Sequence, residues 1–333
     1  MPPPQGPLRA YYRLVPRIKA LEPERRRAWL SLAAAWAALL IPGLLLGFWL
    51  WRQSGGWFYL FTPPLVAAAL ATWLSPSLLY PFKHEFKRGV IRPMMRELLH
   101  NVDYAPLGSV SALELEASQL FSVPISGVEG EDLVIGRYDG VEVKFSEVVG
   151  YSEIRSQGRI GPLDYSDDAE LRTKQIVFRG LFFIADFNKP TRGQVVVYPD
   201  RLEPRLGPIA GALQPRRDRS GLVHVRMQDP RFERHYVVYA SDAETAHYAL
   251  APALMERLTE FRERARAPVA FSIHNGKLYM AVATRKNMLE PPLFGPLASP
   301  RVFRNYLEDV ELFLSLVEAL GLNRRIWGEG TWP

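Results

Sequence analysis

Two long stretches without a charged residue lie in the first quarter of the chain. Ala28–Trp51 has 24 residues and Trp57–Phe82 has 26, and only the polar segment Arg52–Gly56 separates them. About 20 apolar helical residues span the hydrocarbon core of a bilayer, where a helix satisfies its own backbone hydrogen bonds. The pattern therefore predicts an antiparallel transmembrane hairpin.

Each stretch has an alternative interpretation. The first could be a cleaved signal peptide, although its apolar run is long for one and a second run follows directly. The second contains Pro63 and Pro64 near its start, which fits the first turn of a helix. A re-entrant segment is the alternative there, and it would place the bulk of the protein on the opposite side of the membrane.

The chain from residue 101 to 333 has the pattern of one soluble domain, long enough for a substantial core. Leu133–Tyr138 and Val141–Val149 alternate around Asp139-Gly140, which predicts a β-hairpin. Gln175–Phe187 is apolar on both faces and therefore predicts a central strand covered on two sides. Further strands are expected at Gln194–Tyr198, Leu222–Met227, His235–Ala240, Val269–Ile273 and Leu278–Ala283.

Helices alternate with these later strands. Ser241-Asp242 can cap a helix over Ala243–Leu250, and Pro252 suits the first turn of another that runs to about Ala265. A final amphipathic helix is expected to begin near Arg301. Asn275-Gly276 is typical of a two-residue hairpin turn. Together the elements predict an α+β fold with a mainly antiparallel sheet and C-terminal helices, placed after the transmembrane hairpin.

The distribution of charge predicts the orientation of the hairpin. Residues 1–27 form a basic segment with seven Lys or Arg and two Glu, and residues 83–100 form a second basic segment. The connection between the apolar stretches carries Arg52 alone. The positive-inside rule then predicts a multi-pass protein of the cell membrane with both termini in the cytoplasm. The complete absence of cysteine fits this compartment.

The overall net charge of +6 does not indicate nucleic-acid binding. Residues 1–27 carry a net +5 and Arg52 adds one, so the chain from Lys83 onward is neutral. No basic surplus remains there for a phosphate-binding face. Two interpretations of the basic flanks remain: they only orient the hairpin, or they also lie along the inner membrane surface. The candidate membrane-surface residues are Arg25, Arg26, Arg27, Lys83, Lys87 and Arg88.

No catalytic motif stands out. The sequence lacks G-x-S-x-G, G-x-x-x-x-G-K-[ST], G-x-G-x-x-G and H-E-x-x-H, and its six histidines show no metal-ligand spacing. The acidic run at Asp164–Glu170 lacks the alternation of a calcium loop, and a solvated loop is the simpler interpretation. A basic cluster at Arg216–Arg219 has the same alternatives, an anion site or a solvated loop. We therefore assign no catalytic residue, no metal and no cofactor.

Arg179 is the position with the clearest functional potential. It interrupts the apolar strand directly before Gly180, and an unpaired charge in such a strand is costly. One interpretation is recognition of an acidic ligand in a cavity beside Gly180, where backbone can approach closely. The other is a structural ion pair with Glu142 or Glu147. His235 is the third candidate ligand-binding residue.

Several segments resemble one bacterial family. These are Val177–Phe183 (VFRGLFF), Tyr236–Asp242 (YVVYASD), Pro252–Leu258 (PALMERL), Gly276–Tyr279 (GKLY) and Leu322–Trp327 (LNRRIW), downstream of the two apolar stretches. In this order they resemble the proteins grouped as domain of unknown function 3137, over residues from about 20 to 327. The resemblance implies a bacterial membrane protein with a cytoplasmic α+β domain. The family has no assigned activity, so the resemblance supplies no site residue.

Three classes of function fit these observations. The leading hypothesis is a membrane-anchored module without catalysis that binds a protein partner or a small ligand at the inner leaflet. The second is an enzyme acting on a lipid or membrane-associated metabolite, with Arg179, His235 and Glu256 converging in a pocket. The third is an assembly protein whose hairpins associate through small residues at Ala33–Ala35 and Ala67–Ala69. The sequence does not define the oligomeric state.

Overall fold

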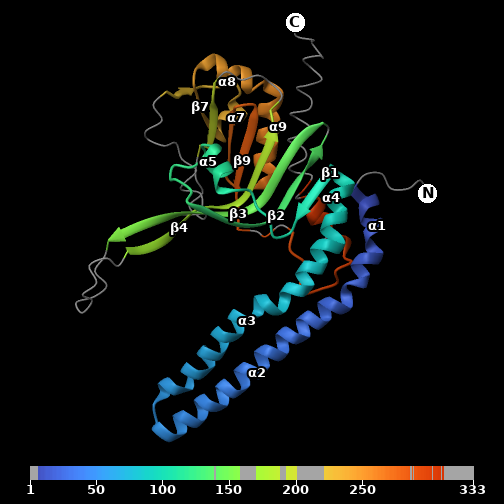
Figure 1. The fold of residues 1–333 in the computed structure, drawn as a ribbon, viewed down its shortest axis with the longest axis vertical. Coiled ribbons are helices and arrows are strands. Elements are labelled where there is room, and N and C mark those ends of the chain that lie inside the picture. Colours follow the sequence, from blue (N-terminus) through green and yellow to red (C-terminus); the bar gives the residue numbers. More distant parts are fainter. Residues whose placement is uncertain are drawn as a thin grey trace. The chain divides into compact units, whose positions relative to one another are not determined.

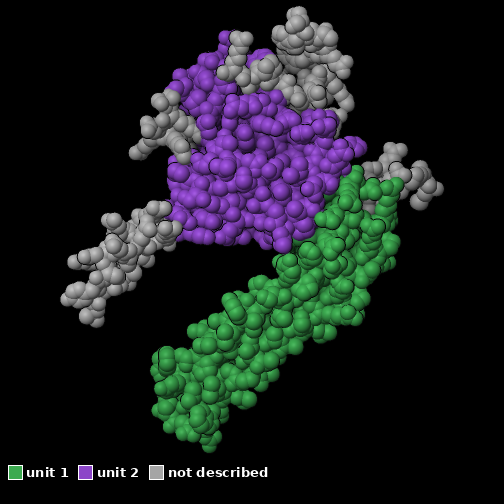
Figure 2. Space-filling model, viewed as in Figure 1, with its two compact units in different colours: residues 1–97, 289–306 green, residues 98–288, 307–333 purple. Residues whose placement is uncertain are grey.

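The computed structural model describes residues 7–138, 140–157, 170–187, 193–200, 221–285, 287, 289–301, 303–308 and 310 (Figure 1). The chain forms two compact units (Figure 2). The first contains residues 1–97 and 289–306, and the second contains residues 98–288 and 307–333. The fold class is α+β, which confirms the prediction. Helices with two apolar candidate spans precede a nine-stranded antiparallel sheet and its helices.

The described N-terminal part of the first unit is helical. Its elements are α1 (Pro7–Ala20), α2 (Glu22–Ser54), the short 3-10 helix η1 (Trp57–Leu60), α3 (Thr62–Phe86), the π-helical turn η2 (Lys87–Ile91) and α4 (Arg92–Leu98). The first charge-free stretch lies within α2, and the second begins in η1 and continues into α3. By length and composition, the helical segments Glu22–Ser54 and Trp57–Leu98 are long and apolar enough to cross a membrane. Pro63 and Pro64 lie in the first turn of α3, where proline needs no hydrogen-bond partner for its nitrogen.

Helices α2 and α3 pack against each other as a hairpin (Figure 1). Gly43 and Gly47 are buried on α2, and Ala67 and Ala71 are buried on α3. A Cβ atom at Gly43 would lie 3.0 Å from the Ala67 Cβ. Small residues four positions apart thus let the two backbones approach closely, as they do in many membrane helix pairs.

The sheet of the second unit has the strand order β1-β2-β3-β4-β9-β8-β5-β7-β6, with every pair antiparallel. Its strands are β1 (His100–Ala105), β2 (Gly127–Tyr138), β3 (Val141–Gln157), β4 (Glu170–Asp186), β5 (Val195–Pro199), β6 (Val223–Val225), β7 (Tyr236–Ala240), β8 (Val269–His274) and β9 (Lys277–Ala283). The helices that accompany it are α5 (Ala112–Ala117), α7 (Pro230–Glu233), α8 (Ala243–Ala249) and α9 (Pro252–Ala265).

Local sequence explains several element boundaries. Asn275 and Gly276 both have positive φ, 51° and 67°, and they join β8 to β9 in a two-residue turn. This backbone matches the type I′ hairpin turn that Asn-Gly favours. Asp242 caps α8 by accepting a hydrogen bond from the Thr245 backbone N–H at 2.7 Å. The sequence pattern predicted both features.

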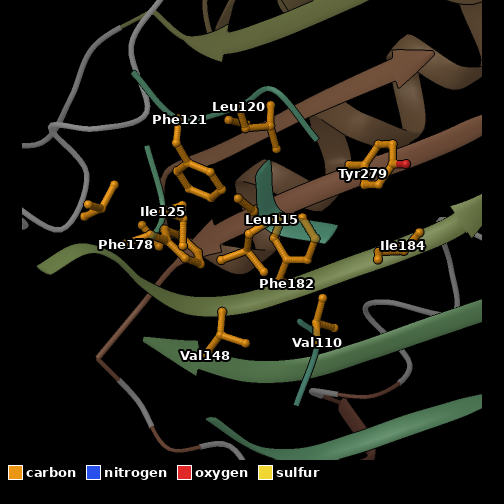
Figure 3. Close-up of a cluster of buried hydrophobic side chains, with 14 of the residues drawn as sticks. Val110, Leu115, Leu120, Phe121, Ile125, Val148, Phe178, Phe182, Ile184 and Tyr279 are labelled. Atoms are coloured by element: carbon orange, nitrogen blue, oxygen red, sulfur yellow. The ribbon is translucent and has the colours of Figure 1, made fainter. Parts of the chain in front are cut away.

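The centre of the sheet is covered on both faces. From Val177 to Ala185, β4 is buried at every position except Arg179. One face carries Phe178 and Phe182, which pack with Phe121 and with residues around α5 (Figure 3). The Tyr236 hydroxyl, buried within the second unit, donates a hydrogen bond to the Leu258 carbonyl of α9. The burial of β4 and its place between β3 and β9 confirm the expected central strand.

Some predicted features fall outside the described residues. They are most of the acidic run at Asp164–Glu170, the basic cluster at Arg216–Arg219 and the C-terminal motif at Leu322–Trp327. The final helix is described only in part, with helical backbone at residues 300–301, 303–308 and 310.

Candidate functional site

Arg179 lies in the middle of β4, opposite Val149 of β3, and its side chain is half-buried. Its backbone carbonyl accepts a hydrogen bond from the Thr284 N–H at 3.2 Å. Across the described residues, the structure records no ion pair for its guanidinium. Of the two expected partners, Glu142 bonds instead to Arg137 at 2.7 Å, and Glu147 belongs to a cluster of carboxylates described below.

Gly180 marks a close approach between β4 and β9. Its φ of +154° is a conformation that other residues rarely adopt. A Cβ atom there would overlap the Val282 carbonyl oxygen and lie 2.9 Å from the Thr284 nitrogen. Backbone does approach Gly180 closely, as expected, but that backbone belongs to the neighbouring strand. Gly180 therefore has a packing role in the sheet.

His235 immediately precedes β7 and contacts Glu263 of α9. Its Nε2 lies 3.3 Å from the Glu263 Oε1. Glu263 also accepts two hydrogen bonds from Arg231, at 3.2 and 2.6 Å. These bonds from Arg231 are the main reason that the pKa of the Glu263 carboxyl lies below its usual value. Arg231, His235 and Glu263 thus form a trio at the protein surface, and any anionic or cationic group that they bind would be exposed to solvent.

The structure does not bring Arg179 and His235 together. Arg179 is on β4 and His235 is at the start of β7, and β9, β8 and β5 lie between these strands. Neighbouring strands are about 4.8 Å apart, so the two positions are roughly 19 Å apart across the sheet. Glu256 is exposed on α9. The structure therefore does not bring these residues together in one small pocket, as the enzyme hypothesis requires.

Three of the six candidate membrane-surface residues make contacts inside the first unit. Arg25 donates to the Glu22 carboxylate at 2.5 Å and to the Leu293 carbonyl at 2.6 Å. Lys83 and Lys87 lie 2.5 and 3.2 Å from the two carboxylate oxygens of Glu290. Lys87 is almost completely buried. Arg26, Arg27 and Arg88 are exposed.

A carboxylate cluster that the sequence analysis missed lies between β2 and β3. Glu131 pairs with Glu147 across the strands, and a bulge after Glu131 turns Asp132 to the same place. Oxygen atoms of these three residues lie within 4.8 Å of one another. Asp132 is buried, has a positive φ of 60° and accepts a hydrogen bond from the Tyr104 hydroxyl at 2.5 Å.

Carboxylate oxygens in this arrangement are chemically suited to a hard cation such as Ca²⁺ or Mg²⁺. The signal in the sequence was the break in alternation at Glu131-Asp132 within an otherwise strand-like segment. That signal does not identify Glu147 as a partner, because the pairing register decides which residue of β3 faces the bulge.

Comparison with known proteins supports the family resemblance. Residues 176–322 match the model of the family described as protein of unknown function (DUF3137). The matched region contains four of the five quoted segments in full and only Leu322 of the fifth, and it does not include the apolar stretches. No curated protein matches the chain.

One solved structure is similar in part. It is the crystal structure of the mycobacterial trehalose monomycolate transport factor A, TtfA, with 13% sequence identity. The similarity covers 66% of this chain and 88% of that one, with a TM-score of 0.31.

Proposed function

We propose that the protein is a membrane-anchored binding module, in which α2 and α3 cross the bilayer and the sheet unit recognises a protein partner or a small ligand. The observation that carries the proposal is the outward-facing surface of the hairpin. Its exposed large apolar side chains include Ile41, Leu44, Leu45, Leu46, Phe48, Trp49, Leu65, Val66, Leu70 and Trp73. A surface of this kind is unfavourable in water and favourable in lipid.

The interior of the hairpin supports the same proposal. The helix contact uses Gly43, Gly47, Ala67 and Ala71, whose small side chains allow the close packing on which helix association in lipid depends. The Trp36 indole N–H also donates to the Ser75 hydroxyl across the contact at 3.2 Å. Because Ala67 packs inside its own hairpin, it is not free to mediate the association of hairpins that the assembly hypothesis requires.

The proposed location is the inner membrane of a bacterium, with both termini and the sheet unit in the cytoplasm. The basic segments that flank the two spans support this orientation. Exposed Arg26, Arg27 and Arg88 remain available to the anionic leaflet. The resemblance to an uncharacterised family is consistent with a role in binding and specifies no partner.

Topology can be tested because the chain contains no cysteine. Single substitutions Ser54→Cys, at the end of α2, and Leu113→Cys, on α5 and 81% exposed, would be treated with an impermeant maleimide. We expect labelling of Ser54→Cys in intact spheroplasts and labelling of Leu113→Cys only after lysis. Labelling of Leu113→Cys alone in intact spheroplasts would overturn the proposed orientation.

The binding role is tested by extracting the full chain in native-membrane nanodiscs and analysing bound proteins and small molecules by mass spectrometry. A stoichiometric protein or ligand that also binds the purified chain supports the proposal. A bound lipid or metabolite that the chain converts to a product would favour the enzyme hypothesis. Recovery of the chain only as a homo-oligomer would favour the assembly hypothesis.

A further inference from the structure

Residues 289–306 follow the last strand of the sheet unit in sequence, yet they belong to the first unit. Contacts to the start of α2 and to residues at and after the end of α3, which both lie at the open end of the hairpin, hold them there. Arg25 of α2 donates to the Leu293 carbonyl, and Glu22 accepts a hydrogen bond from the Leu297 backbone N–H at 3.3 Å. Lys83 and Lys87, after the second apolar stretch, both bind Glu290.

These contacts fix the level of the segment along the hairpin axis. Arg25 precedes Ala28, the first residue of the charge-free stretch, by three positions, and Lys83 directly follows Phe82, the last residue of the second. At 1.5 Å of rise per residue, both contacts lie within about 5 Å of the ends of the apolar stretches. The headgroup layer of a bilayer begins at this level and is roughly 5–8 Å thick.

The segment presents an apolar side chain at this level. Phe294 follows Leu293, whose carbonyl is bound by Arg25, and it is 73% exposed. Gly295 has a φ of +82°, which turns the chain, and Pro296 is exposed as well. Leu297 is buried again and anchors the other side of the loop. The loop is thus held at both ends while its tip, residues 294–296, makes no packing contact that buries it.

Two exposed arginines lie close in sequence to Arg25, which binds the loop. Arg26 and Arg27 follow Arg25 on α2, and the Arg26 side chain is 73% exposed. An exposed aromatic ring and exposed arginines at one level along the hairpin axis are a combination that suits the interface of an anionic bilayer, with the ring among the headgroups and the guanidinium groups on the phosphates.

We propose that the loop of residues 291–297 is a membrane-contacting element, in which Phe294 inserts among the headgroups of an anionic leaflet. The proposal rests on the proposed function, because it requires α2 and α3 to span the bilayer. The occupant of this surface is therefore lipid. A segment distant in sequence from the spans becomes the third part of the membrane anchor.

The test uses three single-cysteine variants of the full chain, each spin-labelled and reconstituted in vesicles of phosphatidylglycerol and phosphatidylethanolamine. Phe294→Cys reports on the loop. Leu45→Cys, exposed on α2, is the lipid reference, and Leu113→Cys, exposed on α5, is the water reference. Accessibility of each label to oxygen and to a water-soluble nickel complex gives its depth. All three positions are exposed, so the labels should leave the fold intact, which thermal unfolding checks.

We expect the label at position 294 to have a depth between the two references, at the headgroup level. A label at 294 with the same accessibility as the one at 113, while the label at 45 is in lipid, would overturn the loop proposal and leave the anchor standing. A label at 45 that is accessible to the nickel complex like the one at 113 would overturn the proposed membrane anchor itself.

Discussion

The helical hairpin and the β-sheet bury opposite kinds of residue. In the hairpin, Gly43 and Gly47 face inward, whereas Leu45 and Trp73 are 65% and 74% exposed. In the sheet unit, large side chains such as Phe182 are completely buried. The difference indicates two solvents. Burying large apolar groups stabilises a fold in water, whereas in lipid that gain disappears and close packing of small residues takes its place.

The largest expected effect comes from truncating a large side chain in the sheet unit, and the same truncation in the hairpin serves as its control. Phe182→Ala removes a ring that packs with Phe121 and Tyr279, at centroid distances of 6.3 and 6.5 Å. The cavity costs about 3–5 kcal/mol. In a domain of this size that lowers the melting temperature by roughly 10 °C, which differential scanning fluorimetry in detergent would measure.

Phe48→Ala is the matched control in the hairpin, where the ring is half-exposed on α2. We expect its melting temperature to stay close to that of the unaltered protein. The ring faces the detergent, so detergent fills the space that the ring leaves and no cavity forms. A decrease in melting temperature for Phe48→Ala as large as the decrease for Phe182→Ala would contradict this expectation. It would show that burial of large apolar side chains stabilises the hairpin, as it stabilises a fold in water.

The next effect concerns the contact of β4 with β9 at Gly180. Gly180→Ala combines a backbone conformation reserved for glycine with an overlap of the new methyl group and the Val282 carbonyl. We expect a loss of about 3 kcal/mol, from both terms together. Gly276→Ala tests the backbone conformation without the overlap, because Gly276 also has positive φ but no other atom lies within 4 Å of a Cβ built there. Its loss should be about 1 kcal/mol. Equal losses would contradict the proposed overlap.

Local sequence was sufficient to predict many of the elements, although not α1, β1, α5 or α7. The Asn275-Gly276 turn, the Asp242 cap and the apolar strand around Arg179 each depend on residues close in sequence, so their patterns were visible in the chain. The two apolar stretches were visible for the same reason, and they lie in α2 and in η1 with α3.

The candidate sites were less accessible to sequence analysis, because they depend on strand order and register. Arg179 and His235 are separated by three strands that come from later and intervening parts of the chain. The cluster of Glu131, Asp132 and Glu147 depends on one bulge in β2. Contacts such as Arg25 to Leu293 join residues 268 positions apart, and no local pattern indicates such a pairing.

A substitution at Gly47 tests the small-residue contact of the hairpin. A Cβ there would lie 2.9 Å from the Tyr59 carbonyl and 3.2 Å from the Leu60 carbonyl, and backbone atoms cannot move aside as a side chain can. Gly47→Val should therefore cost about 1–3 kcal/mol of helix packing and push the helices apart. Spin labels at Leu45→Cys and Val66→Cys in nanodiscs would report a longer or broader distance. Ala33→Val, at an exposed position of α2, should leave the distance unchanged.

The smallest expected effect on stability concerns ion pairs, of which the sheet unit has an exposed example and the helical unit a sheltered one. Hydrogen bonds from Arg231 lower the pKa of Glu263, so the ionised carboxylate stabilises the folded state above its usual pKa, which is near 4.5. This contribution is lost as the pH falls through the lower folded pKa. The difference in melting temperature between the unaltered protein and Glu263→Gln should thus be steady above about pH 5 and shrink at more acidic pH. Glu256→Gln, on the same helix, is the control.

Salt sharpens this last comparison. The Glu263 and Arg231 side chains are 40% and 45% exposed, whereas those of Glu290 and Lys87 are 15% and 5% exposed. Dissolved ions screen exposed charges strongly and sheltered charges weakly. Raising the salt concentration should therefore remove most of the effect of Glu263→Gln and little of the effect of Glu290→Gln. Equal salt sensitivity would contradict the sheltered position of the pair that holds residues 289–306 to the hairpin.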